Sequence, residues 1–312
     1  MRAISQQVLG GPEVLELVEI DTPELQTNEV LVRVRAASIN PVDWLIRAGI
    51  NPPILGEPPF ILGYDVSGVV EKVGPGTTRF KPGDEVHGMT RIGGGYAEYV
   101  SVSARTLALK PTSLDHVEAA ALPLAGLTAW QGLVDGAALE AGQRVLIHGA
   151  GGGVGHLAVQ IAKARGAYVI GTASADKRDF VLGLGADEVL DYRAVDFAEA
   201  VRDIDVVLNL INANAGADYS ERSLEVIRPG GVLVTAVERE DLALTARAEA
   251  AGVRYVEIAV ESDYAELEKL DELVDEKRLR AQVAHALPLE EACKAHKLVE
   301  QGHVKGKIVL TA

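Results

Sequence analysis

The sequence is poor in cysteine, in aromatic side chains and in long apolar runs. Its one cysteine, Cys293, cannot form a disulfide within the chain, which fits a reducing compartment. Aromatic residues make up 4% of the 312 positions and hydrophobic residues 48%, so the core must be mainly aliphatic. No apolar run reaches the ~18 residues of a membrane span, and residues 1–7 lack the apolar centre of a secretion signal. We therefore expect a cytoplasmic protein without a membrane span.

Basic side chains are also in the minority. The chain has 30 Lys and Arg against 45 Asp and Glu, a formal net charge of −15, so a basic surface for nucleic acid or acidic lipid is not expected. One cysteine cannot make a four-cysteine zinc site. The seven histidines, which include His87, His116, His148 and His156, are not spaced as a metal cluster. We expect no bound metal.

A glycine-rich turn at residues 149–155 is the most informative stretch. Residues 145–147 are apolar and favour a strand, and residues 157–162 carry apolar side chains at helical spacing. A second apolar strand is expected at residues 168–172, which completes a strand–helix–strand unit. The sequence therefore predicts a dinucleotide-binding turn, and the alternative is a glycine-rich turn that binds nothing.

Each small residue of this turn has a predicted task. Ala150 lies where the turn tightens, Gly152 admits the pyrophosphate, and Gly155 lets the helix pack closely on the strand. Backbone N–H groups and the positive end of the helix then hold the phosphates. The cofactor contacts predicted within the turn are Ala150, Gly152, Gly153, Val154 and Gly155.

The end of the second strand indicates which coenzyme is used. An NAD site has an acidic residue about 20 residues after the glycine turn. The corresponding position here is Ser174, and no acid occupies residues 172–174. The Ser174 hydroxyl and the Lys177 ammonium, with Arg178 as the alternative cation, suit the 2′-phosphate of NADPH. Against this, the two cations could form a solvated helical turn, and Asp176 could repel a phosphate.

The rest of the chain predicts an α/β fold in two parts. Short strands are expected at 30–36, 68–73 and 85–88, and residues 93–100 are expected to form a flexible loop that leads into a further strand, a spacing typical of a compact barrel. The proline-rich segment 50–59 is either a connector or part of a substrate entrance.

Later strands alternate with helices, which predicts a parallel, doubly wound sheet. These strands are expected at 205–209, 231–236 and 254–260. Helices return within 263–300, and a strand at 306–310 closes the chain.

The order of motifs resembles the medium-chain dehydrogenase/reductase superfamily, and within it the zinc-independent quinone oxidoreductase-like group. The resemblance covers nearly the whole chain. It rests on residues 37–43, 62–68, 126–129, 148–155, 183–187 and 306–310. It implies a GroES-like β-barrel domain, built from residues 1–122 and 263–312, and an inserted Rossmann domain at 123–262. Cofactor and substrate would meet in the cleft between them.

The resemblance also bears on metal and on chemistry. In the family's alcohol dehydrogenases a zinc-ligating cysteine falls within the stretch 38–43 and a histidine falls at Tyr64, and this chain has neither. Without zinc, reduction of a simple carbonyl lacks its Lewis acid. Hydride addition to a quinone or to an enone or 2-alkenal needs only hydrogen-bond donors at the substrate oxygen. The resemblance thus implies an NADPH-dependent reductase of quinones or α,β-unsaturated carbonyl compounds.

The resemblance assigns roles to several residues. Asn40 and Thr128 would lie near the nicotinamide, and Tyr64 could donate a hydrogen bond to the substrate oxygen. Asp43 is either a site carboxylate or a local turn partner, and solvent is the expected source of the proton. Tyr192 would lie beside the 2′-phosphate or the adenine. The remaining predicted cofactor contacts are Thr172, Leu210, Ala236 and Lys307.

Three further expectations concern His148, assembly and alternative functions. His148, beside the glycine turn, is expected to be packed or hydrogen-bonded at a strand end rather than catalytic. Val256, Ile258 and Val260 lie on a late, edge-like strand, which predicts a homodimer. A non-catalytic NADPH-binding protein and a pathway-specific enoyl reductase stay open as alternatives.

Overall fold

The computed structural model describes residues 1–50, 56–211, 218–237 and 241–312, so residues 51–55 of the predicted proline-rich segment lie outside the described residues. The chain divides into two compact units. The first comprises residues 1–125, 262–275 and 280–312, and the second comprises 126–261 and 276–279. None of the helices in the described ranges has the length and apolar character that a bilayer crossing requires.

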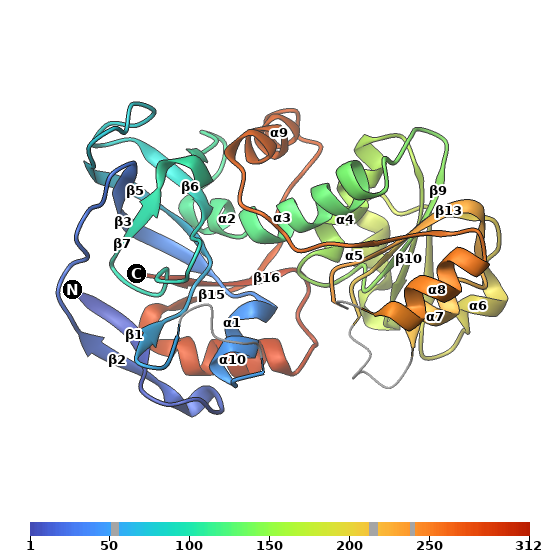
Figure 1. Cartoon of the computed structure of the whole chain (residues 1–312), viewed down its shortest axis with the longest axis horizontal. Coiled ribbons are helices and arrows are strands. Elements are labelled where there is room, and N and C mark those ends of the chain that lie inside the picture. Colours follow the sequence, from blue (N-terminus) through green and yellow to red (C-terminus); the bar gives the residue numbers. More distant parts are fainter. Residues whose placement is uncertain (51–55, 212–217, 238–240) are drawn as a thin grey trace. The chain divides into compact units, whose positions relative to one another are not determined.

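The first unit is mainly antiparallel sheet (Figure 1). A three-stranded sheet has the order β2-β1-β4, and a larger one has the order β15-β16-β3-β5-β6-β8, with β7 also paired to β3. The strands are β1 (Arg2–Gln6), β2 (Leu15–Glu19), β3 (Glu29–Ser38), β4 (Phe60–Ile61), β5 (Asp65–Val73), β6 (Glu85–Met89), β7 (Tyr99–Ser103), β8 (Leu107–Leu109), β15 (Val283–Pro288) and β16 (Lys307–Thr311).

Strand β16 comes late in the sequence but pairs with the early strand β3. The pairing is antiparallel, with Val309 opposite Ser38 and Leu310 opposite Ala37. This register brings Lys307, the first residue of β16, to the end of β3. The helices of this unit are α1 (Pro41–Arg47), α2 (His116–Ala120), α9 (Tyr264–Asp275) and α10 (Ala292–Glu300). Helix α3 (Pro123–Trp130) carries the chain into the second unit.

The second unit confirms the predicted parallel, doubly wound sheet. Its six strands pair in parallel in the order β11-β10-β9-β12-β13-β14. The strands are β9 (Arg144–His148), β10 (Tyr168–Ala173), β11 (Glu188–Asp191), β12 (Ile204–Asn209), β13 (Ile227–Thr235) and β14 (Arg254–Glu257). The helices are α4 (Gly155–Ala164), α5 (Arg178–Gly183), α6 (Phe197–Ala200), α7 (Tyr219–Ser223) and α8 (Leu242–Ala250).

The core of this sheet is aliphatic, as the low aromatic content predicts. Leu146, Ile170, Val207 and Leu233, from four neighbouring strands, are all completely buried. Each such side chain contributes about 1.5–3 kcal/mol when it leaves water. The strand expected at 254–260 ends earlier, at Glu257.

Candidate active site

The glycine turn connects the end of β9 to the start of α4. Gly149 has a φ of +75°, which favours glycine, and its carbonyl oxygen accepts a 2.9 Å hydrogen bond from the Gly152 amide. A Cβ atom on Gly155 would lie 2.1 Å from the same carbonyl oxygen. Gly155 is therefore required where the first residue of α4 packs against the backbone of residues 149 and 150, directly after β9.

Gly152 differs from Gly155 in its surroundings. A Cβ atom on Gly152 would meet a single neighbour within 4 Å among the described residues, the Gly149 oxygen at 3.3 Å. Gly152, Gly153 and Val154 are partly exposed, and they directly precede the ten-residue helix α4. The Gly152 amide is bonded to Gly149, so the amides of Gly153 and Val154 are the ones that lie at the positive end of the helix, where an anion is favoured.

The predicted phosphate-binding side chains lie close to this turn. Lys177 is 9% exposed, and its Cδ would be 2.9 Å from a Cβ atom on Gly151, so its aliphatic stem covers the turn. Ser174 directly follows β10 and is also buried, and its carbonyl accepts a 2.9 Å bond from the Lys177 amide. Arg178 is exposed. Tyr192 is 45% exposed, and its amide bonds to Ala173 at the end of β10 at 3.4 Å.

The other predicted coenzyme contacts of this unit lie at the same edge of the sheet. Thr172 pairs with His148 near the carboxyl end of β10, and Leu210 directly follows β12. Ala236 directly follows β13, and its amide donates to Asn209 at 3.3 Å. The carboxyl edge of a parallel sheet is where doubly wound folds bind ligands. Thr128 is buried on α3, in the second unit.

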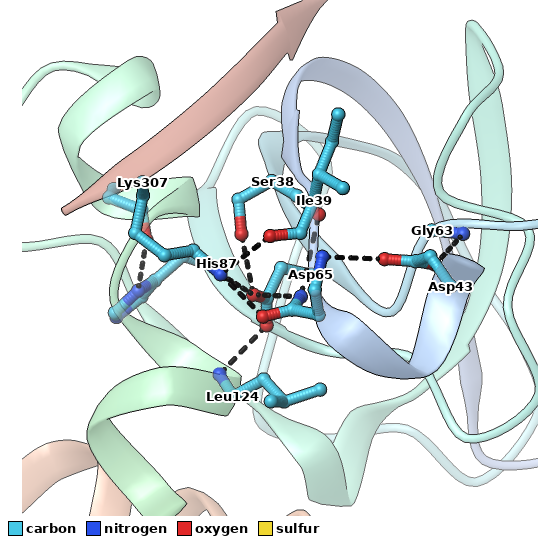
Figure 2. A network of polar contacts seen from close by, with 10 residues as sticks. Ser38, Ile39, Asp43, Gly63, Asp65, His87, Leu124 and Lys307 are labelled. Carbon is cyan, nitrogen blue, oxygen red and sulfur yellow. Dashed lines mark hydrogen bonds and ion pairs between the residues drawn. The ribbon is translucent and has the colours of Figure 1, made fainter. Parts of the chain in front are cut away.

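A buried polar network occupies the first unit, and it is centred on Asp65 (Figure 2). The Asp65 carboxylate accepts hydrogen bonds from Ser38 Oγ (2.6 Å), Asn40 Nδ2 (2.8 Å) and the Leu124 amide (2.8 Å). The Lys307 ammonium lies 3.8 Å from Asp65 Oδ2. Burial raises the pKa of Asp65 and lowers that of Lys307, because each charge has lost its hydration.

Lys307 fixes the orientation of Asn40. Its ammonium donates to the Ile39 carbonyl oxygen at 2.9 Å and to Asn40 Oδ1. The Asn40 amide nitrogen therefore faces Asp65, and the Asn40 side chain is held at both of its polar atoms. Two residues that the sequence predicts as coenzyme contacts, Asn40 and Lys307, thus contact each other; both are at least 96% buried.

Asp43 ties the start of α1 to a distant loop. Its Oδ2 accepts a 2.8 Å bond from the Asn40 amide, which is the local contact that the sequence allows for. Its Oδ1 accepts a second 2.8 Å bond from the Gly63 amide, which the sequence does not predict. Burial raises the pKa of Asp43 to about 7, although the two backbone donors and Lys307 oppose this shift and Asp65 adds to it.

Both chain neighbours of Tyr64 are held by hydrogen bonds. The amide of Gly63 donates to Asp43, and the carboxylate of Asp65 is the centre of the buried network. Tyr64 is 5% exposed, and no described residue accepts or donates a hydrogen bond at its buried hydroxyl. Burial, and then the charge of Asp43, raise the pKa of Tyr64 to about 12. The hydroxyl therefore keeps its proton at neutral pH and can donate it in a hydrogen bond.

The sequence did not assign roles to Ser38 and Asp65, although both lie in the motifs that carry the resemblance. Ser38 is a polar residue just after the predicted strand 30–36, and this was the available signal there. Asp65 lies outside every strand predicted from the sequence, so no such signal existed for it. Within the described ranges, no group of three or more His, Cys, Asp or Glu residues is placed to bind a metal ion. Zinc independence stays a prediction.

The comparisons with known proteins agree with this architecture. Residues 26–112 match the alcohol dehydrogenase GroES-like domain, and residues 184–310 match a family described as zinc-binding dehydrogenase. Human quinone oxidoreductase is 33% identical over 328 residues, which cover 99% of this chain and 97% of the relative.

Two solved structures superpose over the full length of both chains. The structure of Escherichia coli quinone oxidoreductase complexed with NADPH has a TM-score of 0.90 at 30% identity, with 100% coverage of each chain. A structure described as an NAD-dependent alcohol dehydrogenase has a TM-score of 0.91 at 36% identity, again with 100% coverage of each. These neighbours support a nicotinamide coenzyme but differ in which one they name.

The two glycines of the turn allow a test of coenzyme binding. We expect Gly152→Val to weaken NADPH binding by about 100-fold or more, because the branched side chain fills the space next to the Gly153 and Val154 amides. The fold should survive, since the one contact of the added Cβ atom, 3.3 Å from the Gly149 oxygen, requires a shift of only a few tenths of an ångström. NADPH fluorescence titration and thermal unfolding measure the two effects. Gly183→Ala, at a site with no atom within 4 Å of the added Cβ, is the control. Wild-type NADPH affinity in Gly152→Val would show that the turn does not bind the pyrophosphate.

Proposed function

Because this chain belongs to the quinone oxidoreductase group of the medium-chain dehydrogenase/reductase superfamily, we propose that it reduces quinones or α,β-unsaturated carbonyl compounds with NADPH and without a metal ion. Bound NADPH supplies the hydride. The task of the protein is to hold the coenzyme and substrate and to stabilise the charge that develops on the substrate oxygen. The observation that carries the proposal is the buried Tyr64 hydroxyl, which has no partner among the described residues.

Tyr64 is suited to stabilise a developing oxyanion. When hydride reaches a quinone or enone carbon, negative charge collects on the conjugated oxygen, and a preorganised donor lowers the energy of that state. The Tyr64 hydroxyl stays protonated because its pKa is about 12. Its position is fixed on both sides, by the Gly63–Asp43 bond of 2.8 Å and by the three donors to Asp65. Little reorganisation is then needed during the reaction. Solvent provides the proton.

Tyr64→Phe tests this role. We expect kcat/KM for a simple 1,4-benzoquinone to fall about 10- to 100-fold, because one hydrogen bond to a charged oxygen is lost. NADPH affinity should stay unchanged. Initial rates of NADPH oxidation and a separate binding titration measure the two quantities, with Tyr99→Phe on β7 as the matched control.

The same assay separates the proposed activity from its alternatives. The wild-type protein is offered quinones, 2-alkenals and cyclic enones in parallel. Turnover of none of them, with intact NADPH binding, would favour a non-catalytic protein. Tight and exclusive use of one conjugated carbonyl compound would favour a pathway-specific reductase. An active enzyme in which Tyr64→Phe matches wild type would remove Tyr64 from the site.

We propose that this protein uses NADPH rather than NADH, because of the residues that lie beside the turn and at the end of β10. The buried stem of Lys177 lies against Gly151, so its ammonium group is beside the turn. Ser174 adds a hydroxyl at the end of β10, and no acid occupies residues 172–174 to accept bonds from a ribose 2′-hydroxyl. Asp176 is exposed. A 2′-phosphate would therefore meet a cation and a hydrogen-bond donor.

Lys177→Ala should weaken NADPH binding about 10- to 100-fold and leave NADH binding nearly unchanged, because one charged hydrogen bond to the 2′-phosphate is lost. Fluorescence titration with each coenzyme measures the difference. Arg178→Ala, which removes the exposed neighbouring cation, should change neither affinity by more than about 2-fold. Equal losses for both coenzymes in Lys177→Ala, or a wild-type preference for NADH, would contradict the phosphate site.

We also propose a homodimer formed at the outer edge of the six-stranded sheet. Strand β14 ends that sheet, and no described strand pairs with its outer side. Val256 lies on β14, and Ile258 and Val260 follow it; all three are partly exposed. An unprotected strand edge with apolar side chains is a surface on which a second copy can pair.

Light scattering at micromolar concentration should give about twice the chain mass of 33.0 kDa. Val260→Lys should shift the mass toward one chain, because a charge would be buried in the pairing surface. Val8→Lys, at an exposed apolar residue of the other unit, should leave the mass unchanged. A wild-type mass of one chain would count against the dimer.

A further inference from the structure

His148 ends β9, directly before the glycine turn, and is completely buried. The rings of Phe197 and Tyr219 pack against it edge-on, with centroid distances of 4.5 Å and 5.0 Å. Its two nitrogens contact hydroxyl groups: Nδ1 lies 3.3 Å from Thr172 Oγ1, and Nε2 lies 3.1 Å from Ser223 Oγ. The side chain therefore links β10 to α7 from a position behind the turn.

The direction of each hydrogen bond follows from the donors available. The Ser223 hydroxyl donates its proton to the Tyr219 carbonyl oxygen at 2.6 Å, so it can only accept from His148. Nε2 of His148 then carries the imidazole proton, and Nδ1 accepts the proton of the Thr172 hydroxyl. The Thr172 oxygen in turn accepts from the Gly149 amide at 3.3 Å. Each proton in this chain has one acceptor.

Thr172 holds the first two residues of the turn. Its Oγ1 accepts from the Gly149 amide, and its carbonyl oxygen accepts from the Ala150 amide at 3.0 Å. The Gly149 carbonyl then accepts from Gly152, the residue predicted to face the pyrophosphate. The hydrogen-bonded path thus runs from α7 through His148 and Thr172 into the turn. Thr172 is 2% exposed, and its hydroxyl proton is already donated to His148.

We propose that His148 and Thr172 are positioning residues for the coenzyme turn. In this proposal the Thr172 hydroxyl accepts the hydrogen bond of the Gly149 amide and so fixes the turn, and it does not contact the coenzyme. His148, being fully buried, acts through Thr172. The inference rests on the proposed function, since it requires that the turn bind a nicotinamide coenzyme.

The charge state of His148 supports the same arrangement. Burial, together with the nearby Arg222 cation, lowers the pKa of His148 to about 3. The imidazole is therefore neutral, and Nδ1 remains an acceptor for Thr172 throughout the physiological pH range. Nitrogen-15 NMR of the imidazole should find the proton on Nε2, and NADPH affinity should have no step from His148 between about pH 5 and 9. A proton on Nδ1 would reverse the donor and acceptor in both hydrogen bonds of His148 and contradict the assignment.

The central experiment compares Thr172→Val, Thr172→Ser and His148→Leu by NADPH fluorescence titration. Thr172→Val keeps the shape of the side chain but removes the hydroxyl, and we expect the Kd to rise about 5- to 30-fold. Thr172→Ser should restore most of the affinity. His148→Leu should give a similar loss, and the double variant His148→Leu, Thr172→Val should be no weaker than either single one, because both act along one path.

The matched control is Thr106→Val in the other unit. Thr106 is also buried, and its hydroxyl donates to the Ser103 carbonyl oxygen at 3.1 Å. It should lower thermal stability without changing the Kd for NADPH. Three outcomes would overturn the proposal: a wild-type Kd in Thr172→Val, additive losses in the double variant, or full affinity in His148→Leu. Absence of NADPH and NADH binding in the wild-type protein would instead contradict the proposed function itself.

Discussion

The first unit depends on the compensation of buried charge around Asp65 and Lys307. Moving a carboxylate and an ammonium group out of water costs several kcal/mol each, and an ion pair repays this only when further hydrogen bonds complete its surroundings. Here Ser38, Asn40 and the Leu124 amide complete the carboxylate, and the Ile39 carbonyl and Asn40 Oδ1 complete the ammonium. Because these partners come from different elements, one electrostatic requirement fixes the end of β3 and the starts of α1, β5, α3 and β16.

The second unit also contains a buried polar network, but the groups of this network that contact one another are neutral. Behind the glycine turn, a neutral imidazole and two hydroxyl groups pass hydrogen bonds from α7 to Gly149. Neutral groups cost less free energy to bury than ions do. Because the neutral imidazole and each hydroxyl group have a single proton to donate, the donor and acceptor of every hydrogen bond in the series are determined. The amides of Gly149, Ala150 and Gly152 are used within this arrangement. Those of Gly153 and Val154 remain at the start of α4.

Local features of this sequence were predicted well, and long-range ones were not. The strand, turn and helix at 145–163 follow from neighbouring residues, and the parallel sheet follows from their repetition. The contact between Asn40 and Lys307 spans 267 positions, and no periodicity or spacing points to it. The sequence left Asp43 as either a site carboxylate or a local turn partner. Its bond to the Gly63 amide could not be predicted, because the two residues are brought together only by the folding of the first unit. His148 was expected to be packed or hydrogen-bonded at a strand end, and nothing in the sequence indicated that its partner would be Ser223, 75 positions away.

The position of Lys307 in the last strand has a consequence for synthesis on the ribosome. Domains generally fold as units while the chain emerges. The six strands of the second unit are all present once Glu257 has been made, so its sheet can form early. Asp65 is made before this sheet, but its cation does not exist until Lys307, near the end of the chain, has been added. The part of the first unit that precedes the second in the chain is therefore completed after it, and a chain cut before Lys307 would leave the Asp65 carboxylate without the charge that makes its burial tolerable.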